Sequence, residues 1–269
     1  MEEAAVATSG GLTPVREAFG LRPSAETDLL SLLEGGLLRE LGAAHDRGET
    51  RDLPVTGYKP APLYRRPRKI WGIGLNYVDH ASDLDETSPT DEPASFMRPD
   101  TTIIGPGDEI FLPSQSERVT AEAEVAVVIG CEAKNVSEAE APSVVAGFVP
   151  VLDMTAEDIL RRNPRYLTRA KSFDTFFSFG AELATPDEID DVSALEVSTV
   201  LNGEVRRANT VSNMTFSPYW LVHFHSRIMT LLPGDVISTG TPGAVVIEDG
   251  DVAECRVIGF EPLSNPVVR

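Results

Sequence analysis

The sequence predicts a β-rich α+β protein with a small N-terminal domain. Short apolar segments bounded by glycine or proline outnumber the segments with helical spacing. The two kinds do not alternate regularly, which argues against a parallel doubly wound sheet. A proline-rich stretch at residues 51–68 separates this strand-rich region from a helical segment. We therefore expect a small N-terminal domain and linker over residues 1–65 and a larger domain over residues 66–269.

The N-terminal region is expected to hold one helix. Residues 1–20 are interpreted as a loosely organised arm. Over residues 24–45, leucines recur at helical spacing behind Ser24, a residue suited to the N-cap position. Gly35 and Gly36 weaken the middle of this helix because glycine has a low helix propensity.

The strand-rich region has short apolar segments with the length and composition of β-strands. Strands are expected at residues 69–74, 122–130, 144–153, 195–201, 235–239 and 251–258. Helices are expected at residues 78–85, 137–141, 156–162 and 218–230. The acidic, proline-containing stretch at residues 83–93 is expected to form a mobile surface loop.

The composition is that of a globular protein and argues against several functional classes. The 23 basic and 42 acidic residues give a net charge of −19, which repels nucleic-acid phosphates and anionic membrane surfaces. No apolar run approaches the ~18 residues needed to span a bilayer, and no basic region of a secretory signal is visible. Cys131 and Cys255 are too few for a disulfide framework, so two reduced thiols are expected. We predict a cytoplasmic protein that binds neither nucleic acid nor membranes.

Two glutamates separated by one residue mark the most informative strand. Side chains alternate along a strand, so Glu122 and Glu124 point to the same face. Two adjacent carboxylates repel, and one of them takes up a proton unless a cation lies between them. Alternatively, this face is solvated. In that case the core side of the strand consists of Ala123, Val125 and Val127.

Asp153 is a candidate third member of the same carboxylate group. It ends the apolar segment 144–153, where an unpaired charge is costly. If this segment neighbours the glutamate strand, three carboxylates converge without histidine or cysteine. Such an all-oxygen donor set suits Mg²⁺ or Mn²⁺, with Ca²⁺ a weaker candidate. Alternatively, Asp153 caps the helix expected at residues 156–162, or it does both.

His80 and Asp83 have the spacing of a general-base pair. They are three residues apart, so they are neighbours on one face of the expected helix. A carboxylate that orients an imidazole raises its basicity. The alternative is a surface histidine in a polar loop.

Lys171 and Thr241 are candidates for contacts to an anionic substrate. Lys171 lies among aromatic residues, where it can neutralise a substrate anion or a developing enolate, pair with Asp174, or extend to solvent. Thr239 and Thr241 lie in a Gly/Pro turn that follows a strand. The free N–H groups and hydroxyls of such a turn can hold a carboxylate.

Taken in order, these segments resemble the fumarylacetoacetate hydrolase superfamily. The resemblance runs from about Lys69 to the C-terminal end, and its motifs are GLNYVDHASD, EAEVAVVIG, a strand ending in Asp153, RAKSFDTF, LNGEV and LLPGDVISTGTP. It implies a mixed β-sandwich roll of the family's C-terminal type, usually in homodimers and often behind a small N-terminal domain.

The resemblance also implies roles for individual residues. The metal ligands, for Mg²⁺ or Mn²⁺ with Ca²⁺ possible in a crystal, would be Glu122, Glu124 and Asp153. The catalytic residues would be His80, Asp83 and Lys171. The residues expected to bind substrate are Thr241, Arg98, Tyr77 and Glu157.

The activity implied by the resemblance is metal-dependent hydrolysis of a C–C bond. The expected substrate is an acylpyruvate or a related β-diketo or 2-oxo acid, which chelates the metal so that an enolate is stabilised while His80 activates water. Two alternatives remain. One is an oxaloacetate-type decarboxylase or an enol–keto isomerase on the same metal site. The other is a family member that binds a ligand without catalysis.

This chain departs from the hydrolytic pattern after Asp153. Glu157 stands where many hydrolytic members have arginine, and Leu160 stands where they have glutamine. An anion in place of a cation reverses the local preference for a substrate carboxylate. The outer pocket is therefore expected to differ, and Arg161, Arg162 and Arg165 are candidates for a replacement cation.

Overall fold

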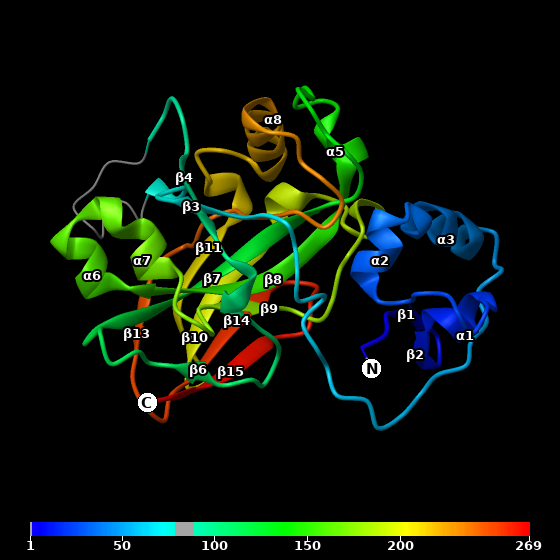
Figure 1. Cartoon of the computed structure of the whole chain (residues 1–269), viewed down its shortest axis with the longest axis horizontal. Helices are drawn as coiled ribbons and strands as arrows, with labels where there is room; N and C mark the ends of the chain where they lie inside the picture. Colours follow the sequence, from blue (N-terminus) through cyan, green and yellow to red (C-terminus); the bar gives the residue numbers. More distant parts are fainter. Residues whose placement is uncertain (1, 79–88) are drawn as a thin grey trace.

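The structure is a computed structural model that describes residues 2–78 and 89–269. Most of the helix expected at residues 78–85 lies outside the described residues, as do His80, Asp83 and the first part of the stretch 83–93. Among the described residues, the strands form two main sheets and one separate hairpin (Figure 1). No helix in this part of the chain is long and apolar enough to cross a membrane.

The larger sheet carries the two long strands on which the metal site was predicted. Its order is β4-β3-β12-β7-β8-β9-β5, with β13 also paired to β7. These strands are β3 (Ile70–Gly74), β4 (Ala94–Arg98), β5 (Ile103–Ile104), β7 (Val119–Ile129), β8 (Val145–Ala156), β9 (Phe177–Phe179), β12 (Val236–Ser238) and β13 (Val245–Ile247). The sheet is mixed, because β12 is parallel to β3 and antiparallel to β7.

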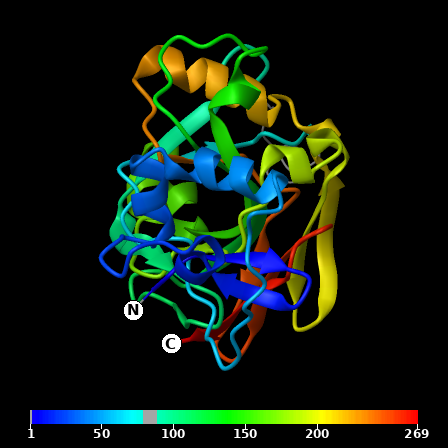
Figure 2. The ribbon, with the colours of Figure 1, turned by 90° about the vertical axis from the view of Figure 1, so that its right-hand side faces the viewer.

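The second sheet packs against one face of the first. Its order is β11-β10-β14-β15-β6. The strands are β6 (Ile110–Phe111), β10 (Glu196–Leu201), β11 (Glu204–Thr210), β14 (Val252–Val257) and β15 (Leu263–Val268). Figure 2 shows β10 and β11, in yellow, beside the large sheet. This architecture confirms the predicted β-rich α+β class.

Short helices cover the ends of the large sheet. They are α5 (Ala141–Val144), α6 (Glu157–Arg162), α7 (Leu167–Lys171) and α8 (Pro218–Ile228). Single 3₁₀ turns lie at Asp100–Thr102, Pro164–Tyr166, Pro186–Glu188, Val192–Ala194 and Val211–Asn213. Helices α5 and α8 lie together at one end, whereas α6 and α7 lie near β4 on another side (Figure 1).

Apolar side chains fill both faces of the large sheet. On β7, Val125 and Val127 belong to the core between the two sheets. The alternate residues Ala126 and Val128 belong to a second cluster on the opposite face, which we call the outer cluster. Every residue of β7 and β8 is buried as a result. The alternative of a solvated face on the glutamate strand is therefore wrong.

The N-terminal region has more structure than the sequence predicted. In place of a loose arm it forms the hairpin of β1 (Ala5–Thr8) and β2 (Gly11–Pro14), followed by α1 (Val15–Phe19). In place of one helix it forms α2 (Leu29–Glu34) and α3 (Leu37–Asp46). The break lies at Gly36, whose φ of 69° is left-handed and incompatible with a continuous helix.

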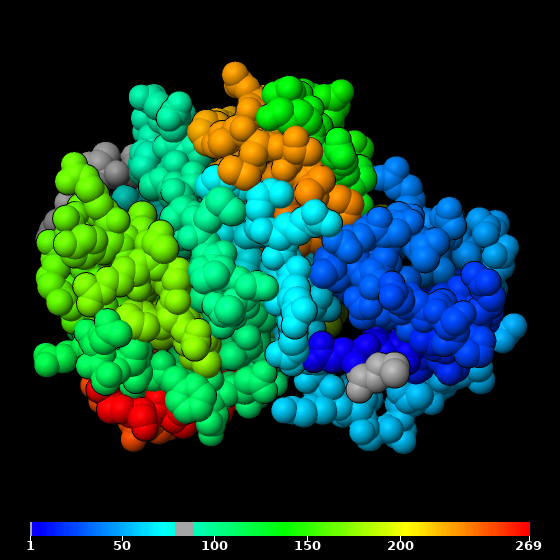
Figure 3. Space-filling view, in the orientation of Figure 1, coloured from blue at the N-terminus to red at the C-terminus, as the bar shows by residue number. Residues whose placement is uncertain are grey.

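Helix α2 attaches the N-terminal region to the outer cluster. Asp28 caps this helix by accepting a hydrogen bond from the Ser31 backbone N–H. Leu33 is packed in the outer cluster, and Tyr64 of the linker lies in the same cluster. Figure 3 shows the N-terminal region, in blue, against the rest of the molecule. The division at residue 65 stays a prediction.

We expect Leu33→Ala to lower the free energy of unfolding by about 2–4 kcal/mol, because it leaves a cavity in the outer cluster. Leu33 is only 1% exposed. The matched control is Leu37→Ala in the next helix, where the side chain is 38% exposed and a change within about 0.5 kcal/mol is expected. Urea denaturation of both variants measures the difference. Equal losses would show that α2 contributes no specific packing.

Candidate metal centre

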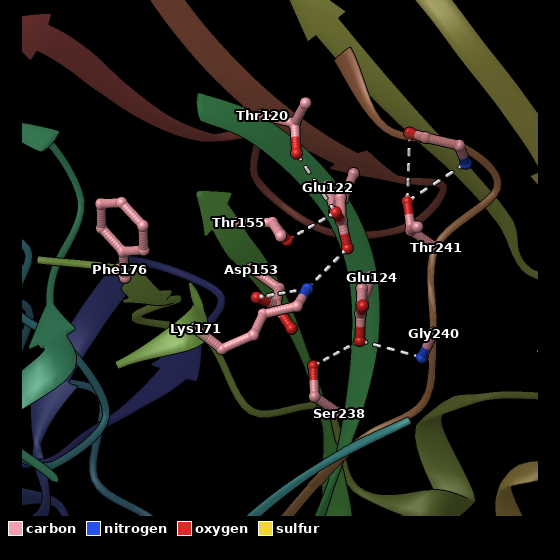
Figure 4. A network of polar contacts seen from close by, with 12 residues as sticks. Thr120, Glu122, Glu124, Asp153, Thr155, Lys171, Phe176, Ser238, Gly240 and Thr241 are labelled. Atoms are coloured by element: carbon pink, nitrogen blue, oxygen red, sulfur yellow. Dashed lines mark hydrogen bonds and ion pairs between the residues drawn. The ribbon is translucent and has the colours of Figure 1, made fainter. Parts of the chain in front are cut away.

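The register of β7 against β8 brings the three predicted carboxylates together. Glu122 pairs directly with Asp153, and Glu124 pairs with Val151. Strand alternation places all three carboxylates on the face that carries the outer cluster, beyond the end of its apolar residues. One oxygen from each carboxylate lies within 4.8 Å of the others. Figure 4 shows the three side chains pointing toward one another from the two strands.

Each glutamate is held in place by hydrogen-bond donors from neighbouring strands. Thr155 Oγ1 donates to Glu122 Oε1 at 2.7 Å. Ser238 Oγ and the Gly240 backbone N–H donate to Glu124 Oε2 at 2.5 and 2.9 Å. These donors fix the carboxylates in the orientation that faces the centre (Figure 4).

Lys171 lies among the carboxylate oxygens. This residue ends α7, and its Nζ is 2.9 Å from Glu122 Oε2 and 3.0 Å from Asp153 Oδ1. The alternative ion pair with Asp174 is not formed, because Lys171 pairs with Glu122 and Asp153. Lys171 also does not extend to solvent, since its side chain is only 7% exposed. Lys171 therefore lies beside two of the predicted ligands, and its role at a substrate oxygen stays a prediction.

Arg98 is the second cation of the centre. It ends β4 and its Nη2 lies 2.5 Å from Asp153 Oδ1. Asp153 does not cap α6, since Ala156 occupies the N-cap position. The alternative in which Asp153 is only a helix cap is therefore wrong.

The three carboxylates fit a divalent cation in charge and in chemistry. With Lys171 and Arg98 protonated and the carboxylates ionised, the group carries a formal net charge of −1, so it still favours a further cation. Asp153 Oδ1 accepts no hydrogen bond from the described residues, although both cations lie within ion-pair distance. An all-oxygen donor set is the one that Mg²⁺ and Mn²⁺ prefer.

Burial and charge shift the pKa values of two groups at this centre. Burial, with a smaller contribution from Asp153, raises the pKa of Glu124 to about 8. For Lys171, burial lowers the pKa, but the opposing charges of Asp153 and Glu122 outweigh it, so its pKa is raised. Lys171 therefore stays protonated at neutral pH.

We expect Mn²⁺ affinity to fall as the pH drops below 8. The metal binds the ionised carboxylate, so it must displace the proton of Glu124, whose pKa is about 8. Displacement of one proton predicts a loss of about tenfold in affinity per pH unit below the pKa. Calorimetric titration at pH 6, 7 and 8, in buffers of different ionisation enthalpy, measures the affinity and the released proton. A constant affinity would exclude this linkage.

The remaining predicted residues lie at different places around the centre. Thr241 is buried in the turn after β12, and its Oγ1 exchanges hydrogen bonds with the backbone of Gly243. Tyr77 is fully buried, and its hydroxyl has no hydrogen-bond partner among the described residues. Burial and the charge of Glu124 raise the pKa of this phenol well above its usual value.

Glu157 does not present an unpaired anion to the centre. Its carboxylate forms ion pairs with Arg118 and with Arg161, the latter at 2.7 Å. Arg162 is likewise paired, with Asp158 at 3.3 Å. Two of the arginines that we considered as replacement cations are thus held by acidic residues of α6.

Comparison with known proteins decides the family. A family model described as the fumarylacetoacetate (FAA) hydrolase C-terminal domain matches residues 69–268. The chain belongs to the fumarylacetoacetate hydrolase family. Its similarity to mitochondrial oxaloacetate tautomerase FAHD2A of Homo sapiens is 37% identity over 212 residues, which covers 76% of this chain and 67% of the human protein.

Two solved structures extend the comparison of this family member. A 5-carboxymethyl-2-hydroxymuconate delta-isomerase from Mycobacterium smegmatis is 38% identical, with a TM-score of 0.73, covering 81% of this chain and 85% of that chain. A maleylpyruvate hydrolase from Sphingobium sp. SYK-6, in complex with manganese(II) ion and pyruvate, is 25% identical, with a TM-score of 0.79. The match covers 99% of this chain and 96% of the hydrolase chain. The fumarylacetoacetate hydrolase family thus includes isomerases, tautomerases and hydrolases.

The residues that hold the carboxylates of this family member were not predicted from the sequence. Ser238 and Gly240 contact Glu124, and Thr155 contacts Glu122. Ser238 and Gly240 lie within the STGTP turn that was singled out for Thr241, and Thr155 follows Asp153 by two residues on the same strand face. That alternation was the available signal for Thr155.

Proposed function

We propose that this protein is a Mg²⁺- or Mn²⁺-dependent enzyme that converts a 2-oxo acid through its enolate. The observation that carries the proposal is the buried group of Glu122, Glu124 and Asp153 with Lys171 in direct contact. The three carboxylates would hold the ion. When bound, the ion would act as a Lewis acid that stabilises negative charge on the substrate oxygens.

The protein's own side chains would supply the other parts of the reaction. The Lys171 ammonium, protonated and nearly excluded from water, would offset charge that develops on the substrate oxygen. The turn that carries Thr241 would bind the substrate carboxylate. His80, oriented by Asp83, would move the proton at the carbon next to the carbonyl, or take a proton from water.

We place enol–keto isomerisation first and C–C bond hydrolysis second. The isomerase and the tautomerase are 38% and 37% identical to this chain, whereas the manganese-bound hydrolase is 25% identical. The ion-paired Glu157, at the position where hydrolytic members often have arginine, also favours a different outer pocket. Hydrolysis stays the second candidate because the hydrolase aligns with almost the whole chain.

Turnover by metal-stripped protein, with and without Mg²⁺ or Mn²⁺, tests the proposal. We expect metal to restore the conversion of enol to keto oxaloacetate, which is measured as loss of the enol absorbance. His80→Ala should lower the rate of this conversion about 10²–10⁴-fold. Release of a carboxylic acid from an acylpyruvate would instead establish the hydrolase, and release of CO₂ a decarboxylase. Ligand binding without turnover under any metal condition would leave a non-catalytic binding protein.

The expected oligomeric state comes from the family resemblance, whereas the expected location comes from the composition of the sequence. We propose a homodimer in the cytoplasm that acts on a small molecule. Sedimentation velocity measures the first of these properties, with a dimer as the expected result.

A further inference from the structure

Arg98, which the sequence suggested as a substrate contact, lies buried against Asp153. Its side chain is 0% exposed. It lies at the end of β4, and its guanidinium spans two partners: Nη2 lies 2.5 Å from Asp153 Oδ1, and Nη1 donates to the Phe176 backbone carbonyl at 2.8 Å. A planar guanidinium can reach two oxygens in fixed directions, which an ammonium group cannot do.

Two aromatic rings fix the guanidinium in this position. The Arg98 Cζ atom lies 5.4 Å from the centre of the Phe96 ring and 5.0 Å from that of Phe177. Both distances are typical of cation–π contacts, which gain strength when the cation is removed from water. The same Phe96 ring lies 5.4 Å from Lys171 Nζ, so one ring contacts both cations of the centre.

The position of Phe96 depends in turn on Gly72 of the neighbouring strand. A Cβ atom at residue 72 would lie 2.3 Å from Phe96 Cζ, a distance that real contacts do not allow. The absence of a side chain at Gly72 therefore leaves room for the far end of the Phe96 ring. Strand, ring and guanidinium together form a rigid support next to Asp153.

We infer that Arg98 is a positioning residue that orients Asp153 for metal binding. The inference rests on the proposed metal-dependent function. Arg98 and Lys171 both lie against Asp153 Oδ1, so the other carboxylate oxygen is the one that we assign to the metal. The contacts of Arg98 are with Asp153, the Phe176 carbonyl and two rings, whereas Lys171 lies among the ligand oxygens themselves.

The test is a titration of the Arg98→Met and Arg98→Lys variants with Mn²⁺. The electron paramagnetic resonance signal of free Mn²⁺ measures how much of the ion is bound. Residues that contact a metal ligand without contacting the metal typically contribute 10–100-fold to metal affinity. We therefore expect a loss of Mn²⁺ affinity of that size for Arg98→Met. Arg98→Lys restores the charge without the planar fork, and an intermediate affinity is expected. Arg256→Met is the matched control, since this arginine is ion-paired to Glu254 on β14 and should leave Mn²⁺ affinity unchanged.

A second variant keeps the inference testable if Arg98→Met does not fold. Phe96→Leu retains both cations and removes the ring beneath them, for which a loss of about 2–5-fold in Mn²⁺ affinity is expected. Folded Arg98 variants with a lower melting temperature and an unchanged or tighter Mn²⁺ affinity would overturn the inference and leave the proposed function standing. No Mn²⁺ binding by the wild-type protein would overturn both.

Discussion

Glu124→Gln is expected to abolish metal-dependent turnover and to weaken Mn²⁺ binding by at least about 100-fold, more than loss of a supporting residue would. Glu124 is 1% exposed, and one of its carboxylate oxygens lies within 4.8 Å of an oxygen of Glu122 and an oxygen of Asp153. Glutamine has the same shape, and its amide oxygen can accept the hydrogen bonds from Ser238 and Gly240. The variant therefore removes the charge and leaves the packing intact. Mn²⁺ titration and the oxaloacetate assay measure the two effects.

Although Glu124→Gln weakens metal binding, it should stabilise the metal-free protein at pH 8. The folded pKa of Glu124, about 8, lies above its ordinary value of 4.5. The contribution of Glu124 to the free energy of unfolding is therefore fully present below pH 4.5 and is lost as the pH rises through 8. Glu124→Gln does not ionise, so its melting temperature at pH 8 should exceed that of the wild type by a few degrees.

A glutamate outside the carboxylate group provides the comparison for Glu124→Gln. Glu254 and its ion-pair partner Arg256 both lie on β14, and Glu254→Gln should leave metal binding and turnover unchanged. Metal-dependent turnover that survives Glu124→Gln would contradict the assignment of this residue as a ligand.

Lys171→Met is expected to lower kcat by about 10²–10³-fold, the usual effect of removing a group that stabilises an oxyanion. Mn²⁺ affinity should be unchanged or tighter. The reason is that the Lys171 ammonium lies 2.9 Å from Glu122 Oε2 and 3.0 Å from Asp153 Oδ1, where it repels an incoming cation. The variant thus separates the loss of catalysis from the loss of metal.

Lys134→Met is the matched control for this lysine. Lys134 is exposed, and its Nζ donates a hydrogen bond to the Arg227 backbone carbonyl at 3.5 Å. Both kcat and metal affinity should stay at the wild-type values. A Lys171→Met protein with normal kcat would exclude a role for Lys171 at the substrate oxygen, whichever reaction outcome the enzyme has.

Several parts of the fold could be predicted because they depend on neighbouring residues alone. The period-two spacing of Glu122 and Glu124 determines that they share a strand face. The strands around them, and α6 and α8, are found close to the predicted positions. The N-terminal helix was predicted as continuous because its leucine spacing outweighed Gly36, whose left-handed backbone separates α2 from α3.

The sequence by itself determined the residues of the centre, their order along the chain and the oxygen donors that suit a hard divalent metal. Only the tertiary structure decided that Asp153 lies opposite Glu122, that both sheet faces are covered, and that Arg98 is buried against Asp153. Alternation along a strand follows from local backbone geometry, whereas strand register and ion pairing depend on contacts between distant parts of the chain. For Arg98 and Asp153 that separation is 55 residues, and no local pattern encodes it.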